Sequence, residues 1–109
     1  MSDQTPQVRD LTPEQVARGM QEGRFVLVDV REPNETEVER FPDAVLAPLS
    51  AFDPAAIPAP AGRDVVFACR SGRRSVTASL AAQEQGFAYS SHMAGGILAW
   101  KAAGLPTET

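Results

Sequence analysis

The stretch VVFACRSGRRSVTASL, residues 65–80, decides the fold of this chain. Residues 65–68 form a short apolar run of the kind that a buried strand shows. From Ser75 onward the stretch is rich in alanine and leucine behind a good N-cap residue, which predicts a helix. A tight loop joins the two elements, and it begins with Cys69, the only cysteine in the chain.

The loop after Cys69 predicts an anion site built around a thiol. Backbone N–H groups and the positive end of the helix dipole meet where a strand passes through a loop into a helix. Three arginines lie in this loop: Arg70, Arg73 and Arg74. Helix N-termini and arginines lower the pKa of a thiol from ~8.5 to about 3.5–7.5. We therefore expect a reactive Cys69; the alternative is a buried structural cysteine, which would need none of these arginines.

Length and composition predict one globular domain. The 109 residues are 43% hydrophobic and 22% charged, which is ordinary for a soluble protein. We expect a flexible polar tail over residues 1–7 and a single domain over residues 8–109. The net charge of −4 argues against a nucleic-acid binder.

The start of the chain and its cysteine usage predict where the protein works. The segment MSDQTPQV is polar and lacks the apolar stretch of a signal peptide. No apolar run approaches the ~20 residues of a membrane span. A lone cysteine forms no internal disulfide, which favours a reducing compartment. We expect a cytoplasmic protein without a membrane partner.

Strand and helix patterns alternate along the chain, which predicts an α/β fold with a mostly parallel sheet. A helix is expected from Thr12, as N-cap before Pro13, to Gly23, and the next strand is the apolar run Phe25–Val30. The other expected elements are a helix that starts at Pro33 and Glu35 and continues as a solvated helix over 37–40, a strand over 44–46, a helical turn near Phe52, a strand over 65–68, a helix from Ser75 to Gly86, a strand over 87–89 and a last helix carrying Trp100 and ending at Gly104.

Charged residues follow the apolar run 25–30, where open α/β sheets place their sites. They are Asp29, Arg31 and Glu32, with Pro33 directly after them. The carboxyl ends of parallel strands face the site crevice in such sheets. The alternative is that these charges only solubilise an exposed turn.

The chain closely resembles a single-domain rhodanese in four consecutive segments: VDVREP (28–33), FPDAVLAPL (41–49), CRSGRRS (69–75) and MAGGILAWKAAGLP (93–106). The pattern Cys-x-x-Gly-x-Arg-Ser after a buried strand is fairly specific, and the Gly-Gly and Gly-Leu-Pro ending strengthens it. The resemblance implies a five-stranded parallel sheet flanked by helices on both faces. It also implies a sulfurtransferase in which Cys69 carries a sulfane sulfur as a persulfide.

The resemblance assigns roles within the loop. The backbone N–H groups of residues 70–75, including Ser71 and Ser75, would stabilise the thiolate and the persulfide anion. Gly72 would allow the tight turn. Arg70 and Arg73 are candidates for binding an anionic donor such as thiosulfate, because guanidinium groups match oxyanions. Arg74 would be structural, and a pairing with Asp29 would fix the loop.

The same resemblance suggests the partners and exposes some departures. The acceptor would be cyanide or a thiol, with thioredoxin or a protein persulfide as partner proteins, and no cofactor or metal is expected. The family commonly has Gly-His-Ile-Pro-Gly-Ala where this chain has Glu39–Ala44. We expect Arg40 and Asp43 to change the local loop, and Asp43 to alter the rim of the site.

Three alternatives stay open from the residues. A cysteine phosphatase or arsenate reductase needs arginine six positions after the cysteine, where this chain has Ser75, and histidine before it, where it has Ala68. A non-catalytic rhodanese-like module would only bind a partner, although such modules often lack the cysteine. His92, the only histidine, could pair with the thiol, but a surface or turn position is the more common case.

Overall fold

A computed structural model describes residues 7–109, so the expected tail lies almost entirely outside the described residues. The described chain forms one sheet in the order β1-β5-β4-β2-β3, with every neighbouring pair parallel. The five strands are β1 (Arg9–Leu11), β2 (Phe25–Asp29), β3 (Val45–Leu46), β4 (Asp64–Ala68) and β5 (Ser91–Met93). The expected α/β fold with a five-stranded parallel sheet is confirmed.

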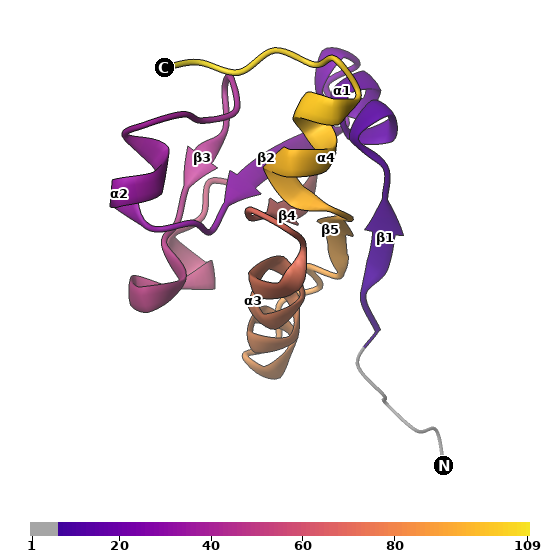
Figure 1. The fold of residues 1–109 in the computed structure, drawn as a ribbon. Coiled ribbons are helices and arrows are strands. Elements are labelled where there is room, and N and C mark those ends of the chain that lie inside the picture. The colour runs from indigo at the N-terminus through magenta and orange to yellow at the C-terminus, as the bar shows by residue number, and fades with distance from the viewer. Residues whose placement is uncertain (1–6) are drawn as a thin grey trace.

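Helices cover both faces of the sheet. They are α1 (Pro13–Gln21), α2 (Pro33–Thr36), α3 (Arg73–Glu84) and α4 (Gly96–Ala102), and single 3₁₀ turns cover Leu49–Ala51 and Pro54–Ala56. Figure 1 shows α1 and α4 together on one side of the sheet and α3 on the other. No helix within residues 7–109 has the length and apolar character needed to cross a membrane.

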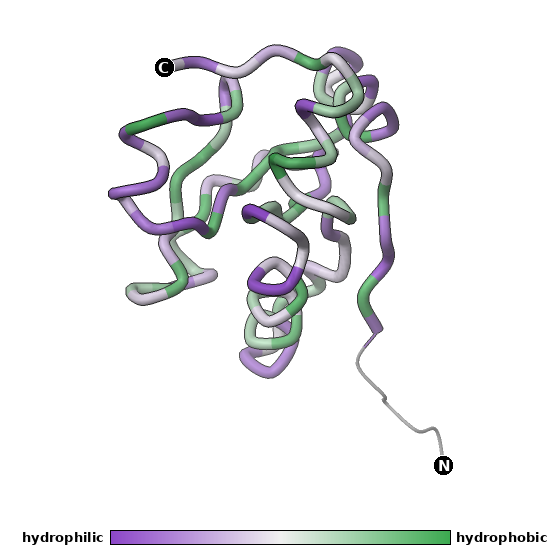
Figure 2. Tube along the Cα trace, in the orientation of Figure 1, coloured by the Kyte–Doolittle hydropathy of each residue, from purple (hydrophilic) through white to green (hydrophobic). Residues whose placement is uncertain are grey.

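Alternating side chains of the strands build two cores. On β4, Val66 and Ala68 face α1 and α4, whereas Val65 and Phe67 face α3. Cys69 continues this alternation and lies in the core on the α3 side. Figure 2 shows β2 as a largely hydrophobic trace and the segment around α2 as a largely hydrophilic one. Because both faces of β2 and β4 are covered, these strands are apolar almost throughout.

The predicted start of α1 is confirmed in detail. The backbone N–H of Gln15 donates to the Thr12 hydroxyl at 3.1 Å, and the backbone N–H of Thr12 donates to the Gln15 side chain at 2.8 Å. This reciprocal capping box satisfies two backbone donors that would otherwise lack partners at the start of the helix. Gly23 follows the last turn with φ +72°, as a glycine that stops a helix does.

Three element boundaries differ from the prediction. Helix α3 begins at Arg73, not Ser75, because Gly72 takes the left-handed φ of +102° directly before it. The last strand is Ser91–Met93, and the apolar residues 87–89 precede it as irregular chain. Helix α2 begins at Pro33, as expected, but it ends at Thr36, so its expected continuation over 37–40 is absent.

Candidate active site

The sulfur of Cys69 lies at the carboxyl end of β4, inside the turn that leads into α3. The backbone N–H of Gly72 donates to Sγ at 3.1 Å, and Sγ lies 3.6 Å from the hydroxyl oxygen of Ser75. Cys69 is 1% exposed and Ser75 is fully buried. The loop therefore folds around the sulfur.

Opposing effects set the pKa of the Cys69 thiol. Burial raises the pKa, because it disfavours the charged thiolate. The Ser75 hydroxyl and the backbone N–H groups of Ser75, Gly72 and Ser71 lower it by more, because they donate hydrogen bonds to the thiolate. The net pKa lies below that of an ordinary thiol, which favours the nucleophilic form.

The pair Gly95 and Gly96, at the start of α4, lets that helix touch the loop. The backbone N–H of Ile97 donates to the carbonyl of Cys69 at 2.8 Å, and that of Leu98 donates to the carbonyl of Arg70 at 3.2 Å. A Cβ on Gly96 would lie 2.3 Å from the Cys69 carbonyl oxygen, so no other residue fits. The loop carbonyls thus cap the start of α4, and this contact fixes the shape of the loop.

Arg74 anchors the loop to α2. Its guanidinium forms two hydrogen bonds with Glu35, at 2.6 and 2.9 Å. The Arg74 hydrogen bond lowers the pKa of Glu35 to about 2, and the same contact raises the pKa of Arg74. The structural role expected for Arg74 thus has a clear partner, but the partner is Glu35. The expected pairing with Asp29 is wrong.

Asp29 pairs with its own neighbour, Arg31. Three side-chain hydrogen bonds of 2.9–3.1 Å join the two groups, and the Arg31 guanidinium also donates to the Glu39 carbonyl at 2.8 Å. Asp29 is fully buried and Arg31 is 5% exposed. Because both charges are buried, they do not merely solubilise a turn. They tie the end of β2 to the segment that follows α2.

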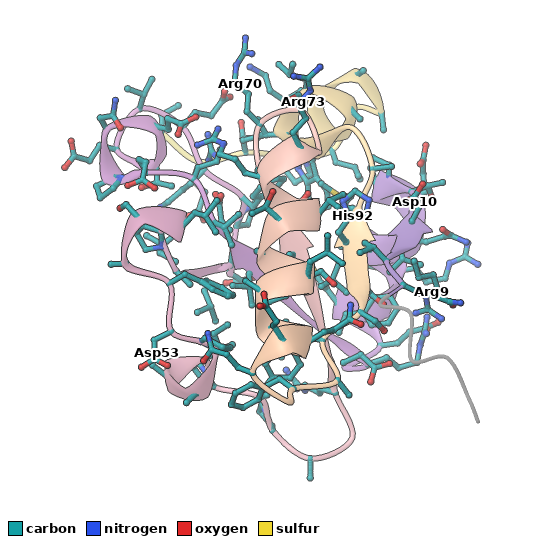
Figure 3. The ribbon with its side chains drawn as sticks, turned by 90° about the horizontal axis from the view of Figure 1, so that it is seen from below. Arg9, Asp10, Asp53, Arg70, Arg73 and His92 are labelled. Atoms are coloured by element: carbon teal, nitrogen blue, oxygen red, sulfur yellow. The ribbon has the colours of Figure 1, made fainter. Side chains whose placement is uncertain are left out.

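Arg70 and Arg73 form the outer rim of the loop. Both side chains are exposed, as is Ser71. Figure 3 shows Arg70 and Arg73 together at one end of the molecule, beside the start of α3. Two positive charges therefore face the solvent next to a nearly buried sulfur.

The polar residues behind the sulfur were not predicted. His92 is 4% exposed, and its Nδ1 lies 2.8 Å from the Ser75 hydroxyl oxygen. Its Nε2 lies 2.7 Å from a carboxylate oxygen of Asp10. The surface or turn position expected for His92 is wrong. The available signal was its place directly before the family-like segment that starts at Met93.

The unusual segment before β3 lies away from the sulfur. Asp43 adopts the left-handed φ of +61°, a conformation that glycine adopts more easily than other residues. It lines a surface hollow with Phe25 and Arg63, which lie at the amino ends of β2 and β4. Cys69 follows the carboxyl end of β4, so the expectation that Asp43 alters the rim of the site is wrong. Arg40 pairs instead with Glu108 near the end of the chain.

Residues 7–109 contain no group of three or more His, Cys, Asp or Glu side chains arranged to hold a metal ion. The site brings together several of the protein's own reactive and hydrogen-bonding groups. These are a nucleophilic thiol, backbone donors, one hydroxyl and one imidazole.

A cysteine cradled at the end of a parallel strand defines a class of α/β proteins, and comparison with known proteins places the chain within it. The model of the Rhodanese-like domain family matches residues 12–103. A protein of Allochromatium vinosum named sulfurtransferase is 40% identical over 81 residues, covering 74% of this chain and 76% of that protein. The chain belongs to the rhodanese-like domain family.

Two further similarities support the fold and show how much of each similar protein this chain covers. An uncharacterized protein of Synechocystis sp. is 39% identical over 97 residues, covering 89% of this chain. The chain spans only 54% of that protein's length. The structure of a rhodanese-related protein from Thermoplasma volcanium has a TM-score of 0.77 and 20% identity, with 92% of this chain and 97% of that chain covered. The last similarity supports the fold alone.

Proposed function

We propose that this protein is a sulfurtransferase that carries a sulfane sulfur on Cys69. The observation that carries the proposal is the hydrogen bonding of Sγ, which accepts from the Gly72 N–H and lies beside Ser75. Donors in these positions stabilise a thiolate and then a persulfide anion. Family membership and the relative named sulfurtransferase support the same general activity.

The cycle has two displacement steps. The Cys69 thiolate attacks the outer sulfur of thiosulfate, a new S–S bond forms, and sulfite leaves with the electron pair of the broken bond. A nucleophilic acceptor, cyanide or a thiolate, then attacks the outer sulfur of the persulfide and releases the Cys69 thiolate. Each step exchanges one bond for another, so the cycle needs no cofactor.

The exposed arginines support an anionic donor. Arg70 and Arg73 lie at the mouth of the loop, where their guanidinium groups would meet the oxyanion end of thiosulfate. Cys69 is 1% exposed, which favours a small donor or the slender end of a protein persulfide. A thiol partner such as thioredoxin could then act as acceptor. A reducing compartment such as the cytoplasm would suit this exchange.

The geometry disfavours the rival functions. A phosphatase would need an arginine at the buried position of Ser75 to bind phosphate, and Arg74 is committed to Glu35. A module that only binds a partner would need neither a cradled sulfur nor a lowered thiol pKa. Sulfur transfer is the function that uses all of these features.

Mass spectrometry of the intact protein tests the proposal. Incubation with thiosulfate is expected to add the mass of one sulfur atom, cyanide is expected to remove it, and Cys69→Ser is expected to gain nothing. If thiosulfate leaves the mass unchanged, glutathione persulfide serves as the second donor. If neither donor modifies Cys69, the sulfurtransferase proposal is overturned and the binding module takes its place.

A further inference from the structure

A chain of hydrogen bonds runs from the Cys69 sulfur to the surface. Sγ lies 3.6 Å from the Ser75 oxygen, that oxygen lies 2.8 Å from His92 Nδ1, and His92 Nε2 lies 2.7 Å from Asp10. Figure 3 shows His92 between α3 and the strand that carries Asp10. The four residues come from the β4–α3 loop, α3, β5 and β1. The fold, rather than sequence proximity, assembles them.

The pairing of β1 with β5 positions the outer end of this chain. Asp10 is the register partner of His92 in the parallel ladder, so the two side chains project toward the same face of the sheet. Asp10 is 73% exposed whereas the His92 ring is 5% exposed. The imidazole is therefore buried with one carboxylate at its outer nitrogen and one hydroxyl at its inner nitrogen.

The direction of each hydrogen bond follows from Asp10. A carboxylate only accepts hydrogen bonds, so His92 Nε2 carries a proton and donates it to Asp10. In the neutral imidazole Nδ1 is then unprotonated and accepts the Ser75 O–H. The Ser75 oxygen is left free to accept the Cys69 S–H. Every donor in the chain thus points outward, from the sulfur toward Asp10.

We propose that His92 receives the Cys69 thiol proton through the Ser75 hydroxyl, and that Asp10 stabilises the resulting imidazolium. In this step the S–H bond breaks and its proton moves to the Ser75 oxygen. The original Ser75 proton moves at the same time to His92 Nδ1. One proton is transferred in total, and the products are a thiolate and an imidazolium. This inference rests on the proposed function only in taking Cys69 as the nucleophile.

After the transfer, the hydrogen bonds between Cys69 and Ser75 and between Ser75 and His92 remain, but donor and acceptor are exchanged in each. Nδ1–H now donates to Ser75, and the Ser75 hydroxyl donates to the thiolate. The Ser75 hydroxyl is also a main cause of the lowered pKa of Cys69. His92 does not touch the sulfur, so it is a positioning residue that acts through Ser75.

Among the charged groups near His92 and Ser75, Asp10 is the main partner of the imidazole. From β1 the ring meets Asp10, and from β4 its register partner is the apolar Phe67. From α3 it meets Ser75, with the thiol behind it. The charged groups in the first turn of α3 are Arg74, bound to Glu35, and the exposed Arg73.

The test is a pH titration of the thiolate, followed by its ultraviolet absorbance and by the rate of alkylation with iodoacetamide. Neither readout needs a sulfur donor, so failure of this inference is distinguishable from failure of the sulfurtransferase proposal. The wild-type protein is expected to form thiolate in two coupled steps. In His92→Asn the amide oxygen can still accept the Ser75 hydrogen bond, but the side chain cannot take up a proton. The Cys69 thiol of this variant is expected to form thiolate in one step, about one pH unit higher than in the wild-type protein. Alkylation below that pH is then expected to be about tenfold slower.

A double-mutant cycle separates proton transfer from a structural role. If His92 acts through Ser75, then Ser75→Ala already removes its influence, and adding His92→Asn is expected to change the titration no further. Additive effects of the two substitutions would overturn the proposal. A titration curve of His92→Asn identical to that of the wild-type protein would also overturn the proposal.

Asp10→Asn keeps the test valid if the buried variants fail to fold. Because Asp10 is 73% exposed, this variant is expected to fold. It is expected to raise the pH at which the Cys69 thiolate forms, but by less than His92→Asn does. Asp64→Asn is the matched control, since it removes the same charge from an exposed residue at the far end of β4. Equal titrations in Asp10→Asn and Asp64→Asn would also overturn the proposal.

Discussion

Two charge pairs near the Cys69 loop differ in burial. Asp29 and Arg31 are buried together, so replacing one alone would leave an uncompensated charge in the core. Arg74 and Glu35 are only partly buried, and they join the start of α3 to α2 across the mouth of the loop. The second pair can therefore be broken without unfolding the protein.

Glu35→Gln is expected to lower the free energy of unfolding by about 1–2 kcal/mol at neutral pH. A two-point hydrogen bond between charged groups is worth about 1.5–3 kcal/mol, and partial exposure reduces that value. Folding lowers the pKa of Glu35 from 4.5 to about 2. The contribution is therefore complete above about 4.5 and is lost as the pH falls toward about 2. Urea unfolding of both proteins across this range measures the difference.

Glu37→Gln is the control for that experiment. Glu37 is exposed one position after α2 and is expected to contribute little at any pH. A difference between wild type and Glu35→Gln that stays constant from neutral pH to acid would contradict the ion-pair account.

At the same scale, the sequence predicts some site residues and misses others. Cys69 and its loop are recognisable because glycine and arginines surround a lone cysteine directly after an apolar run. Asp10 and His92 are 82 positions apart, and only the pairing of β1 with β5 brings them together. The partner of Arg74 was missed for the same reason, since Glu35 lies on a different element. Local pattern carries no information on such contacts.

Among the elements, α4 contacts the Cys69 loop directly although it is distant from the loop in sequence. Its first backbone donors bind the carbonyls of Cys69 and Arg70, and this requires the helix to approach the loop without a side chain between them. The pair Gly95 and Gly96 at the start of α4 thus lies against the Cys69 loop in space, although it is more than twenty positions away from Cys69 in sequence.

Gly96→Ala is expected to lower the free energy of unfolding by more than about 2 kcal/mol and to abolish persulfide formation. The added methyl would lie 2.3–2.4 Å from the backbone of Cys69 and Arg70, so the helix or the loop has to move. Thermal unfolding and mass spectrometry with thiosulfate measure the two effects.

Gly104→Ala separates steric contact from backbone strain. Gly104 also has a positive φ, +78°, but a Cβ there would meet nothing within 4 Å. This control is expected to cost only about 1 kcal/mol and to keep full reactivity. Equal losses in the two variants would show that the contact with the loop is unimportant.

Element type is better predicted than element boundaries in this chain. The capping box of α1 and the apolar strands β2 and β4 depend on neighbouring residues, so their patterns are visible in the sequence. Strand β5, Ser91–Met93, has only one large apolar residue: Met93 lies in the core on the α1 and α4 side, whereas His92 faces α3 and contacts Ser75. The more apolar residues 87–89 attracted the prediction instead, and two of them, Phe87 and Tyr89, stack beside the core on the α3 side.

On the scale of the whole molecule, the charge is distributed unevenly. The chain has a formal net charge of −4, yet the opening of the candidate site carries two exposed arginines. The overall field repels an anionic donor at long range, and only the local field near Arg70 and Arg73 attracts it. The attraction therefore acts over about one Debye length, ~10 Å at 0.1 M salt.

This distribution predicts how salt affects the reaction with thiosulfate. The initial rate of persulfide formation is expected to fall as sodium chloride is raised, because screening weakens the attraction between the two arginines and a divalent anion. In the double variant Arg70→Gln/Arg73→Gln the rate is expected to start lower. Added salt should then change it little or raise it slightly, because only the repulsion from the net negative charge is left to screen.

Arg18→Gln removes an exposed arginine from α1 and is expected to keep the wild-type salt dependence. Alkylation by the uncharged iodoacetamide reports any salt effect on the thiol itself, so a slope shared by both reagents would place the effect on Cys69 and not on donor binding. If the double variant kept the wild-type slope with thiosulfate alone, other cations would have to guide the donor to Cys69.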